Sequence, residues 1–356
     1  MKILGIETSC DETSVAVIEE KNGFLKIVKN LIYSQIKIHQ KYGGVVPEVA
    51  ARRHVEKIIP LITEILKEKN SSASLYFAQN DKIQKPDVIA VTAGPGLATA
   101  LLVGVETARA LAYAWNKPLV AVNHLEGHIY ANFLNKKIST ISKIFPALCL
   151  IISGGHTELI LMKNFGKYKL IGQTKDDAVG ECFDKVGKIL GLPYPGGQQV
   201  AKWALQGKRD AIKFPRPMLE TSDFNFSFSG LKTAVLYHWQ KVPQQSKNDD
   251  SIIANICASF EQAAIDVIIA KTLRAAQKYQ VKTLLTGGGV AANQELQNQL
   301  QKLFKKSAPQ ITFWPIPKNF CGDNAAMIAA AGLFNAKNKK FTDWKKIKIN
   351  SEWELI

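Results

Sequence analysis

The sequence has few cysteines and lacks the spacing that cysteine-based zinc sites need. Its 356 residues include five cysteines, and no two of them are separated by the C-x-x-C interval. The odd count argues against a disulfide scaffold, and the missing interval argues against an all-cysteine zinc site. We therefore expect a protein of a reducing compartment, the cytoplasm.

Three further signals are absent or interrupted. No G-x-x-x-x-G-K-[ST] occurs, so the chain is not a P-loop protein. No secretory signal is visible, since the first apolar run is cut at Glu7. The uncharged residues 88–105 are long enough to suggest a membrane span, but Gly94, Pro95 and Gly96 interrupt them. We expect a buried strand, a tight turn and a helix there, and no membrane association.

Acidic residues are scarce relative to basic ones. The chain has 46 lysines and arginines against 30 acids, which gives a formal net charge of +16. Such a charge favours anionic partners, above all nucleic acid, although solubility explains it equally well. The segment from Lys337 combines six lysines with three aromatic residues. It suits RNA, or it is a last helix or strand that docks its aromatics and exposes its lysines.

The sequence contains one order of strands, turn and helix that occurs twice. An apolar strand from Lys2, a polar glycine-containing turn and two more strands precede a helix that starts at Pro47. The same order returns from Ala147, with its helix beginning near Asp176. Each half later adds a strand, a glycine turn and a helix. The repetition predicts two similar α/β lobes, each a mixed sheet covered by helices.

The first long helix carries two local predictions. Pro47 suits a first helical position, whereas Pro60 lies in the interior and predicts a kink or break. Apolar residues recur at helical spacing and should share one buried face: Val55, Ile58, Ile62 and Ile65. The polar stretches near residues 69–85 and 241–251 are expected to be surface loops.

The glycine turns have a chemical interpretation. Backbone N–H groups can approach an anion closely where no side chain intervenes. We expect one such turn in each lobe to hold phosphate between them, and the turn from Thr286 to receive a polar or anionic group at a helix N-terminus. Any single turn is explained as well by a hairpin or the start of a helix.

Two histidines on one short segment suggest a metal site. Asn123 is a good N-cap after an apolar strand, so His124 and His128 fall one turn apart on one helix face. They can share one metal ion, or they are an ordinary surface pair. The protease motif H-E-x-x-H places its glutamate directly after the first histidine, but Glu126 lies two residues on. The general base of a zinc protease is therefore missing.

Nine motifs stand in one order along the chain: LGIETSCDETSVAV, YGGVVPEVAARRH, TAGPGLATALLVG, NHLEGH, ISGGHTELI, DDAVGECFDKVGKILGLPYPGG, FSFSGLKTAV, TGGGVAANQEL and CGDNAAMIA. Their order resembles the ASKHA superfamily of sugar kinases, Hsp70 and actin. It implies an α/β fold of two similar actin-like, RNase H-like lobes with a nucleotide cleft between them. Taken together, the motifs resemble the tRNA threonylcarbamoyladenosine transferase family, once called the O-sialoglycoprotein endopeptidase family. We expect an N-terminal lobe over residues 1–130, completed by about 315–356, and a C-terminal lobe over 131–314.

The resemblance implies an acyl transfer to tRNA. The donor is threonylcarbamoyl-AMP, and the acceptor is the exocyclic amine of the adenosine 3′ of the anticodon in tRNAs that read codons beginning with A. AMP leaves. The resemblance also implies one divalent metal ion, with Fe(II) favoured over Zn(II), and helper proteins: a smaller ASKHA paralogue and an ATPase subunit, or a homodimer. The competing interpretations are an ASKHA sugar kinase or ATPase, and a non-catalytic subunit that binds tRNA or a partner.

The resemblance further implies site residues. Asp323 completes the metal site with His124 and His128. The substrate-binding set is Ile151, Ile152, Ser153, Gly154, Gly155, Asp184, Gly197 and Asn293. Of these, Asp184 would accept hydrogen bonds from the ribose hydroxyls, Gly197 would bring backbone to the nucleoside, and Asn293 would meet the adenosine. The plainer alternatives are an exposed helix charge, a turn residue and a helix cap.

No catalytic residue is assigned from the sequence. Asp11 and Glu12 are candidates for accepting the proton that leaves the adenine amine, or they order the turn in which they lie.

Overall fold

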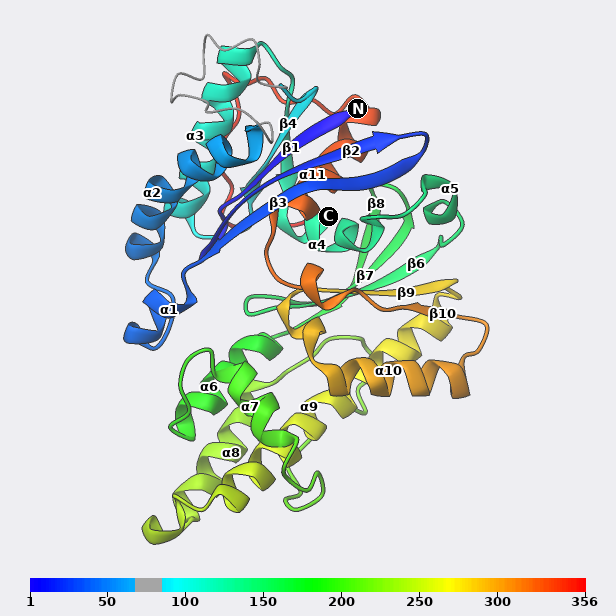
Figure 1. The fold of residues 1–356 in the computed structure, drawn as a ribbon. Helices are drawn as coiled ribbons and strands as arrows, with labels where there is room; N and C mark the ends of the chain where they lie inside the picture. Colours follow the sequence, from blue (N-terminus) through cyan, green and yellow to red (C-terminus); the bar gives the residue numbers. More distant parts are fainter. Residues whose placement is uncertain (68–84) are drawn as a thin grey trace. The chain divides into compact units, whose positions relative to one another are not determined.

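The structure, a computed structural model, describes residues 1–67 and 85–356 and is drawn in Figure 1. The chain forms two compact units. Unit 1 comprises Met1–Lys37, Val45–Ile144 and Gly322–Ile356, and unit 2 comprises Ile38–Gly44 and Phe145–Cys321. The loop expected near residues 69–85 lies, except for Lys85, outside the described residues.

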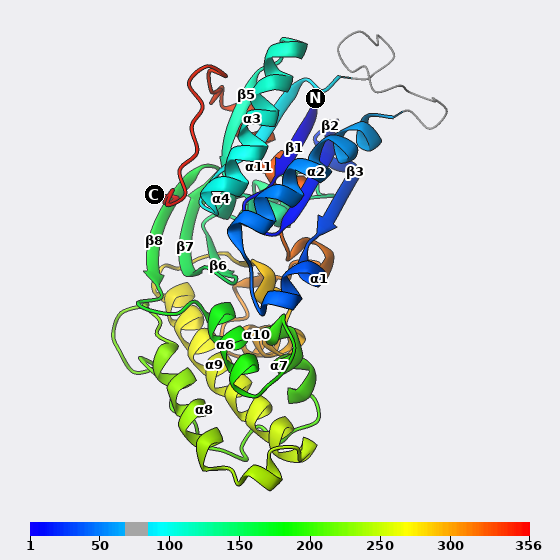
Figure 2. The ribbon, with the colours of Figure 1, turned by 90° about the vertical axis from the view of Figure 1, so that its left-hand side faces the viewer.

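Unit 1 is built on a five-stranded mixed sheet (Figure 2). Its strands are β1 (Lys2–Glu7), β2 (Glu12–Lys21), β3 (Phe24–Ser34), β4 (Val88–Gly94) and β5 (Leu119–Asn123). They lie in the order β3-β2-β1-β4-β5. The first three strands pair antiparallel, and β1, β4 and β5 pair parallel. The antiparallel strands follow one another through short connections, whereas the parallel strands need helical crossovers.

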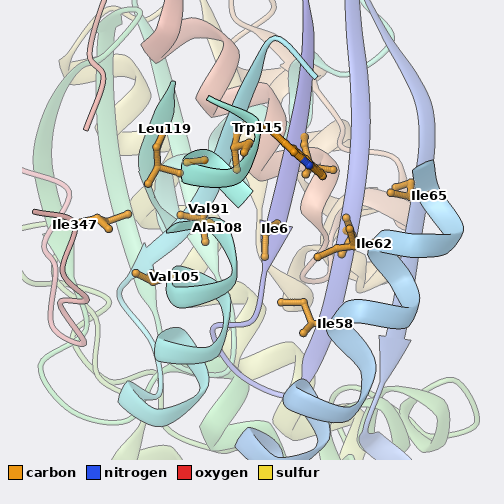
Figure 3. Packing of buried hydrophobic residues seen from close by; sticks show 14 of the residues in the cluster. Ile6, Ile58, Ile62, Ile65, Val91, Val105, Ala108, Trp115, Leu119 and Ile347 are labelled. Atoms are coloured by element: carbon orange, nitrogen blue, oxygen red, sulfur yellow. The ribbon is translucent and has the colours of Figure 1, made fainter. Parts of the chain in front are cut away.

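The helices of unit 1 cover both faces of this sheet. Those with described bounds are α1 (Ile36–His39), α2 (Pro47–Leu66), α3 (Ala98–Trp115), α4 (His124–Tyr130), α5 (Ile138–Ile141) and α11 (Ala325–Lys337), of which α1 runs into unit 2 at Ile38. Ile6 of β1 faces the apolar cluster under α2 and α3 (Figure 3). Gly5 faces the opposite side, because successive residues of a strand alternate. A Cβ on Gly5 would lie 2.2 Å from the carbonyl oxygen of Ala325, so this glycine lets α11 approach the sheet.

Unit 2 repeats the same sheet. Its strands are β6 (Ala147–Ile152), β7 (Thr157–Asn164), β8 (Lys167–Gln173), β9 (Thr283–Gly287) and β10 (Thr312–Trp314), in the order β10-β9-β6-β7-β8. Its helices are α6 (Val179–Ile189), α7 (Gly196–Ala204), α8 (Ser229–Lys241), α9 (Asp250–Lys278) and α10 (Gln294–Ser307). Strand β6 pairs antiparallel with β7 and parallel with β9, as β1 does with β2 and β4. The repeated pattern predicted two similar α/β lobes, each with a mixed sheet, and both mixed sheets are confirmed.

Short 3-10 segments complete the described secondary structure. They lie at Gln40–Tyr42, Ala131–Phe133, Gln244–Ser246, Gly289–Ala292 and Lys318–Phe320. Residues 131–144 belong to unit 1, where the Leu25 amide donates to the Lys136 carbonyl and the Ile138 amide to the Gly23 carbonyl.

The uncharged stretch over residues 88–105 is β4, a turn and the first half of α3, as predicted. One described helix, α9, is long and apolar enough to cross a membrane, but 67% of its most apolar window is buried inside the protein. That burial is typical of a core helix.

Helix α2 departs from the sequence prediction in two ways. It begins at Pro47 as expected, but it runs unbroken through Pro60 to Leu66. Pro60 is exposed, so the carbonyl that loses its N–H partner faces water. Val55 is also exposed, and His54 takes the buried position in its place. The buried face runs from His54 through Ile58 and Ile62, at intervals of one helical turn.

Candidate functional site

Three side chains of unit 1 converge at one end of its sheet. His124 and His128 lie one turn apart on α4, directly after β5, and Asp323 lies just before α11. One ligand atom from each of the three lies within 4.8 Å of the other two. The Asp323 Oδ1 atom is 3.5 Å from His124 Nε2 and 3.2 Å from His128 Nε2. Two imidazoles and one carboxylate are a ligand set that suits Fe(II) or Zn(II).

His128 is the group whose surroundings point most directly to a metal. Its side chain is fully buried, and neither ring nitrogen has a hydrogen-bond partner among the described residues. Its Nε2 atom faces Asp323 without the geometry of a hydrogen bond. A buried polar atom without a partner is costly, and coordination to a metal ion would satisfy it.

Glu7 contacts the cluster of candidate metal ligands, and the sequence pattern alone does not predict this contact. It is fully buried at the end of β1, and its Oε2 atom is 3.0 Å from His124 Nδ1. The same carboxylate accepts hydrogen bonds from the Thr92 hydroxyl and the Ser9 amide. A carboxylate on Nδ1 turns Nε2 of His124 toward the Asp323 side, as in carboxylate–histidine–metal triads. The signal in the sequence was an acid placed directly after an apolar strand.

The electrostatics of the cluster favour ionised carboxylates. Burial alone would raise the pKa of Glu7 and of Asp323, but His124 holds the pKa of both below its usual range. Burial would lower the pKa of His124, but Asp323 and Glu7 raise it well above its usual value. The pocket therefore already favours positive charge at the point where the ligand atoms meet.

Glu126 does not belong to the cluster, although it lies between the two histidines in sequence. Its Oε2 atom accepts a hydrogen bond of 2.8 Å from Asn335 on α11. Gly127 allows this contact, since a Cβ there would lie 2.7 Å from Ile328 of the same helix. The geometry agrees with the absence of the H-E-x-x-H arrangement.

The turn between β1 and β2 differs from the one predicted. It spans Thr8–Asp11 and contains no glycine, because Gly5 lies within β1 where α11 requires it. Glu12 begins β2 and accepts a hydrogen bond from Ser34. Burial and the neighbouring Asp11 raise the pKa of Glu12 well above its usual range.

The glycine turn of unit 2 has open backbone. Ile151 and Ile152 are buried at the end of β6, and Ser153 closes the turn through its hydrogen bonds with His156. Gly154 and Gly155 have no atoms within 4 Å of the place where a Cβ would be. Both residues are exposed, so a ligand can approach their backbone closely.

Two other glycines press against the same turn. A Cβ on Gly288, in the turn after β9, would lie 2.3 Å from the Ile152 carbonyl oxygen. A Cβ on Gly180, at the start of α6, would lie 2.5 Å from the Ser153 carbonyl oxygen. The ISGG turn, the TGGG turn and the first turn of α6 thus meet at one place in unit 2.

Asp184 and Gly197, both predicted substrate residues, contact each other. The Gly197 amide donates a hydrogen bond of 2.7 Å to Asp184 Oδ1, which ties the start of α7 to α6. A Cβ on Gly197 would lie 3.2 Å from Phe183, so glycine keeps this approach close. Asp184 is thus more than an exposed helix charge.

Asn293 lies at the N-terminus of α10 and uses both ends of its amide. Its Oδ1 atom accepts from the Leu296 amide, and its Nδ2 atom donates to Glu261 Oε1 at 2.6 Å. Glu261 is buried, which raises its pKa to about 7 against the hydrogen bond from Asn293. The helix-cap alternative for Asn293 is therefore correct, and one N–H and one lone pair of its amide remain for a ligand.

Two solved structures share this fold and identify the fold class. The T. kodakarensis HypF structure has a TM-score of 0.58 with 14% identity and covers 98% of this chain. A full-length HypF structure in a phosphate- and nucleotide-bound form has a TM-score of 0.57 with 11% identity and covers 95% of this chain. This chain spans about half the length of each, 49% and 46%. The fold is the ASKHA-like α/β fold.

Sequence relatives identify the family within that class. The family model described as tRNA N6-adenosine threonylcarbamoyltransferase, TsaD, matches residues 26–330. A protein of that name from Syntrophomonas wolfei is 47% identical over 95% of this chain and 94% of its own length. Another from Bacillus subtilis is 49% identical over 93% of this chain and 90% of its own length. The chain belongs to this family of acyltransferases.

Proposed function

We propose that the protein transfers the threonylcarbamoyl group from threonylcarbamoyl-AMP to the exocyclic amine of the adenosine 3′ of the anticodon, in tRNAs that read codons beginning with A. AMP is the second product. The observation that carries the proposal is the family match over residues 26–330, together with relatives nearly half identical over almost the whole chain. The cluster of candidate metal ligands and the open glycine turn are consistent with it.

We propose that His124, His128 and Asp323 hold one divalent metal ion, with Fe(II) favoured over Zn(II). The buried His128 ring, whose nitrogens lack hydrogen-bond partners among the described residues, and the convergence of one ligand atom from each residue support this site. Such an ion supplies a Lewis acid that can polarise the carbamoyl carbonyl or hold the leaving phosphate. Glu7 orients His124, and Gly127 lets α4 pack closely on the helix that follows Asp323.

The nucleotide part of the donor is assigned to unit 2. The amides of Gly154 and Gly155 would receive its phosphate or threonylcarbamoyl oxygens, because both residues are exposed and carry no side chain of their own. Asp184 would accept hydrogen bonds from the ribose hydroxyls while its Oδ1 atom fixes the Gly197 backbone. Asn293 would meet the adenosine with its remaining N–H and lone pair. The proton acceptor stays unassigned.

The partners follow from the reaction and from the surface. The tRNA is the acceptor, and the excess of basic residues suits its phosphates. A smaller ASKHA paralogue and an ATPase subunit would assist, with a homodimer as the alternative. Exposed apolar side chains on α2 and α3, Val55, Ile59 and Leu102, would suit such a protein partner. The cytoplasmic location stays a prediction.

Mass spectrometry of tRNA nucleosides tests the reaction. The purified chain is incubated with threonylcarbamoyl-AMP and unmodified tRNA, alone and with candidate partner proteins. We expect threonylcarbamoyladenosine in the digested tRNA and release of AMP. A tRNA whose adenosine stays unmodified with every partner combination, while the protein holds its metal, would contradict the proposal.

A further inference from the structure

The C-terminal strap, residues 342–353, lies outside the family match but packs closely on unit 1. The Thr342 amide donates to the Leu119 carbonyl, and Arg109 donates to the Ile347 carbonyl. Ile347 is buried in the cluster under α2 and α3 (Figure 3), and Trp344 and Trp353 pack against that cluster. The lysines between them are exposed. The strap is thus a docked segment, with its aromatics inward.

The last part of the strap is seated on the ends of β4 and β5. The Asn350 amide donates to the Ala93 carbonyl, and the Gly96 amide donates to the Ser351 carbonyl. Gly94 has a φ of 153°, and a Cβ there would lie 1.8 Å from the Asn350 carbonyl oxygen. The strap therefore fits this place because position 94 carries no side chain.

One contact of the strap reaches Asn123, the residue that caps the candidate metal-binding helix. Asn123 Nδ2 donates a hydrogen bond of 2.9 Å to the Trp353 carbonyl oxygen. The Oδ1 atom of the same amide accepts from the Leu125 and Glu126 amides and caps α4. One side chain thus joins the strap to the first turn of α4, and His124 is the first residue of that turn.

A second route runs from the strap to His124 through the turn after β4. Gly96, held by the Ser351 carbonyl, packs against Ser9, where a Cβ would lie 2.6 Å from the Ser9 carbonyl oxygen. The Leu97 amide donates to that same carbonyl. The Ser9 hydroxyl lies 3.1 Å from His124 Nδ1. The first route ends on the backbone of the turn that begins with His124, and the second ends on the imidazole of His124.

We propose that the strap is a positioning element for the metal centre, in which the Trp353 carbonyl fixes the Asn123 amide and thereby the orientation of His124. The inference rests on the proposed metal site. Only an amide side chain can cap α4 with its oxygen and bind the strap with its nitrogen at once. Serine at this position would cap the helix about as well but could not hold the strap in the same way.

A double-mutant cycle in the full-length chain tests this link. Asn123→Ser keeps the cap and removes the contact with Trp353. Trp353→Ala removes the side chain that holds this end of the strap on the core cluster, so its carbonyl should no longer be held against Asn123. The readout is the affinity for Co²⁺ or Zn²⁺, measured by competition with a chromogenic chelator. We expect each single variant to bind about tenfold more weakly, at the lower end for outer-shell partners. The double variant should bind no more weakly than the weaker single variant, because both changes remove one link.

Two matched variants separate positioning from stability. Trp344→Ala removes the other strap tryptophan, which packs on Tyr113 at 5.0 Å between ring centroids. It should lower the melting temperature and leave metal affinity unchanged. Trp353→Phe should restore most of the affinity, and it serves as the folded reference if Trp353→Ala does not fold.

The outcomes that would overturn the strap inference differ from the one that would overturn the metal site. Wild-type affinity in Asn123→Ser, or fully additive losses in the cycle, would overturn the strap inference while leaving the metal site intact. A loss in Trp344→Ala equal to that in Trp353→Ala would overturn it as well, since it would reflect stability alone. A wild-type chain that binds neither ion would overturn the metal proposal first, and this inference with it.

Discussion

The two units have the same strand order, yet the turn after the first strand of each sheet has different chemistry. In unit 1 the turn follows Glu7, and its Ser9 hydroxyl contacts His124. In unit 2 the turn follows Ile152, and Gly154 and Gly155 leave open space where side chains would be. The same position in the fold is therefore filled by side chains in one unit and by exposed backbone in the other.

This difference teaches how each candidate site should respond to mutation. A site built from converging side chains can be removed by one or two substitutions. A site built from backbone amides loses little when a side chain is changed, unless that side chain fixes the backbone. In unit 2, Asp184 is a side chain that fixes the backbone, because it accepts a hydrogen bond from the Gly197 amide.

The largest effect is expected in unit 1. Changing both His124 and His128 to Ala should abolish stoichiometric metal, because Asp323 alone cannot hold a transition metal ion. Metal analysis of the purified variant, with circular dichroism to confirm folding, gives the result. Glu126→Gln is the matched control, since Glu126 lies between the histidines but bonds Asn335. A double variant that retains a full equivalent of metal would contradict the proposal that His124 and His128 are metal ligands.

The second effect contrasts two buried acids, Glu7 beside an imidazole and Glu261 beside a neutral amide. Burial raises the pKa of Glu261 to about 7 from a usual value of 4.5. The folded state therefore keeps a proton that the unfolded chain has lost between these values, and stability falls as pH rises from about 4.5 to about 7. The loss should be about 3 kcal/mol, at roughly 1.4 kcal/mol for each pKa unit.

The Glu261→Gln variant carries no titrating group and should lack this slope. Denaturant unfolding of both proteins across the pH range gives the difference in free energy of unfolding. Above about pH 7 the two curves should run parallel, because Glu261 is then ionised in both states. Parallel curves across the whole range would mean that Glu261 is ionised in the folded protein throughout.

The third effect concerns Asp184, the side chain of unit 2 that holds the Gly197 backbone. Asp184→Ala should weaken AMP binding by about 1.5–3 kcal/mol, the range for hydrogen bonds to a charged group. Asp184→Asn separates the two roles, because its oxygen can still accept from the Gly197 amide. If Asn restores most of the affinity, Asp184 acts by holding backbone. If it does not, the carboxylate meets the ligand. Calorimetry that finds unchanged affinity in both variants would contradict the assignment of Asp184.

The sequence predicted the parts of this molecule that depend on local pattern. The repeated strand–turn–strand motif predicted both sheets, and the four-residue interval between His124 and His128 placed them on one helix face. Asp323 lies far along the chain, and only the resemblance to a family connected it with them. Local periodicity cannot report which distant strand ends lie side by side.

Three errors and omissions have the same physical origin. The predicted glycine-containing turn after the first strand has no glycine, because Gly5 lies within β1, where α11 approaches closely. Glu7 was overlooked because its contact with His124 depends on β1 and β5 ending at the same edge of the sheet. The Trp353 carbonyl holds Asn123 through backbone, which carries no residue-specific signal. Each depends on tertiary packing rather than on sequence spacing.

The smallest effect concerns the exposed lysines of the strap, Lys345, Lys346 and Lys348. In the proposed reaction the tRNA would be bound largely through its phosphates, because a loop base alone offers few contacts. Each phosphate neutralised by a lysine releases counterions, so tRNA affinity should fall steeply between low and physiological salt. Replacing all three lysines with Gln should reduce the slope of log affinity against log salt by about 1 for each lysine that meets a phosphate.

The same triple variant should leave AMP and metal affinity unchanged, because the inward contacts of the strap, through Trp353 and Asn350, stay in place. Filter binding of tRNA over a salt series, beside the metal competition assay, separates the outer face of the strap from its inner face. If tRNA affinity does not change across the salt series, the net charge of +16 does not serve tRNA binding. A steep slope shared by wild type and variant would move the phosphate contacts to other basic residues. If the triple variant also binds metal more weakly, the exposed lysines influence His124 through the strap. The outer and inner faces of the strap would then not act separately.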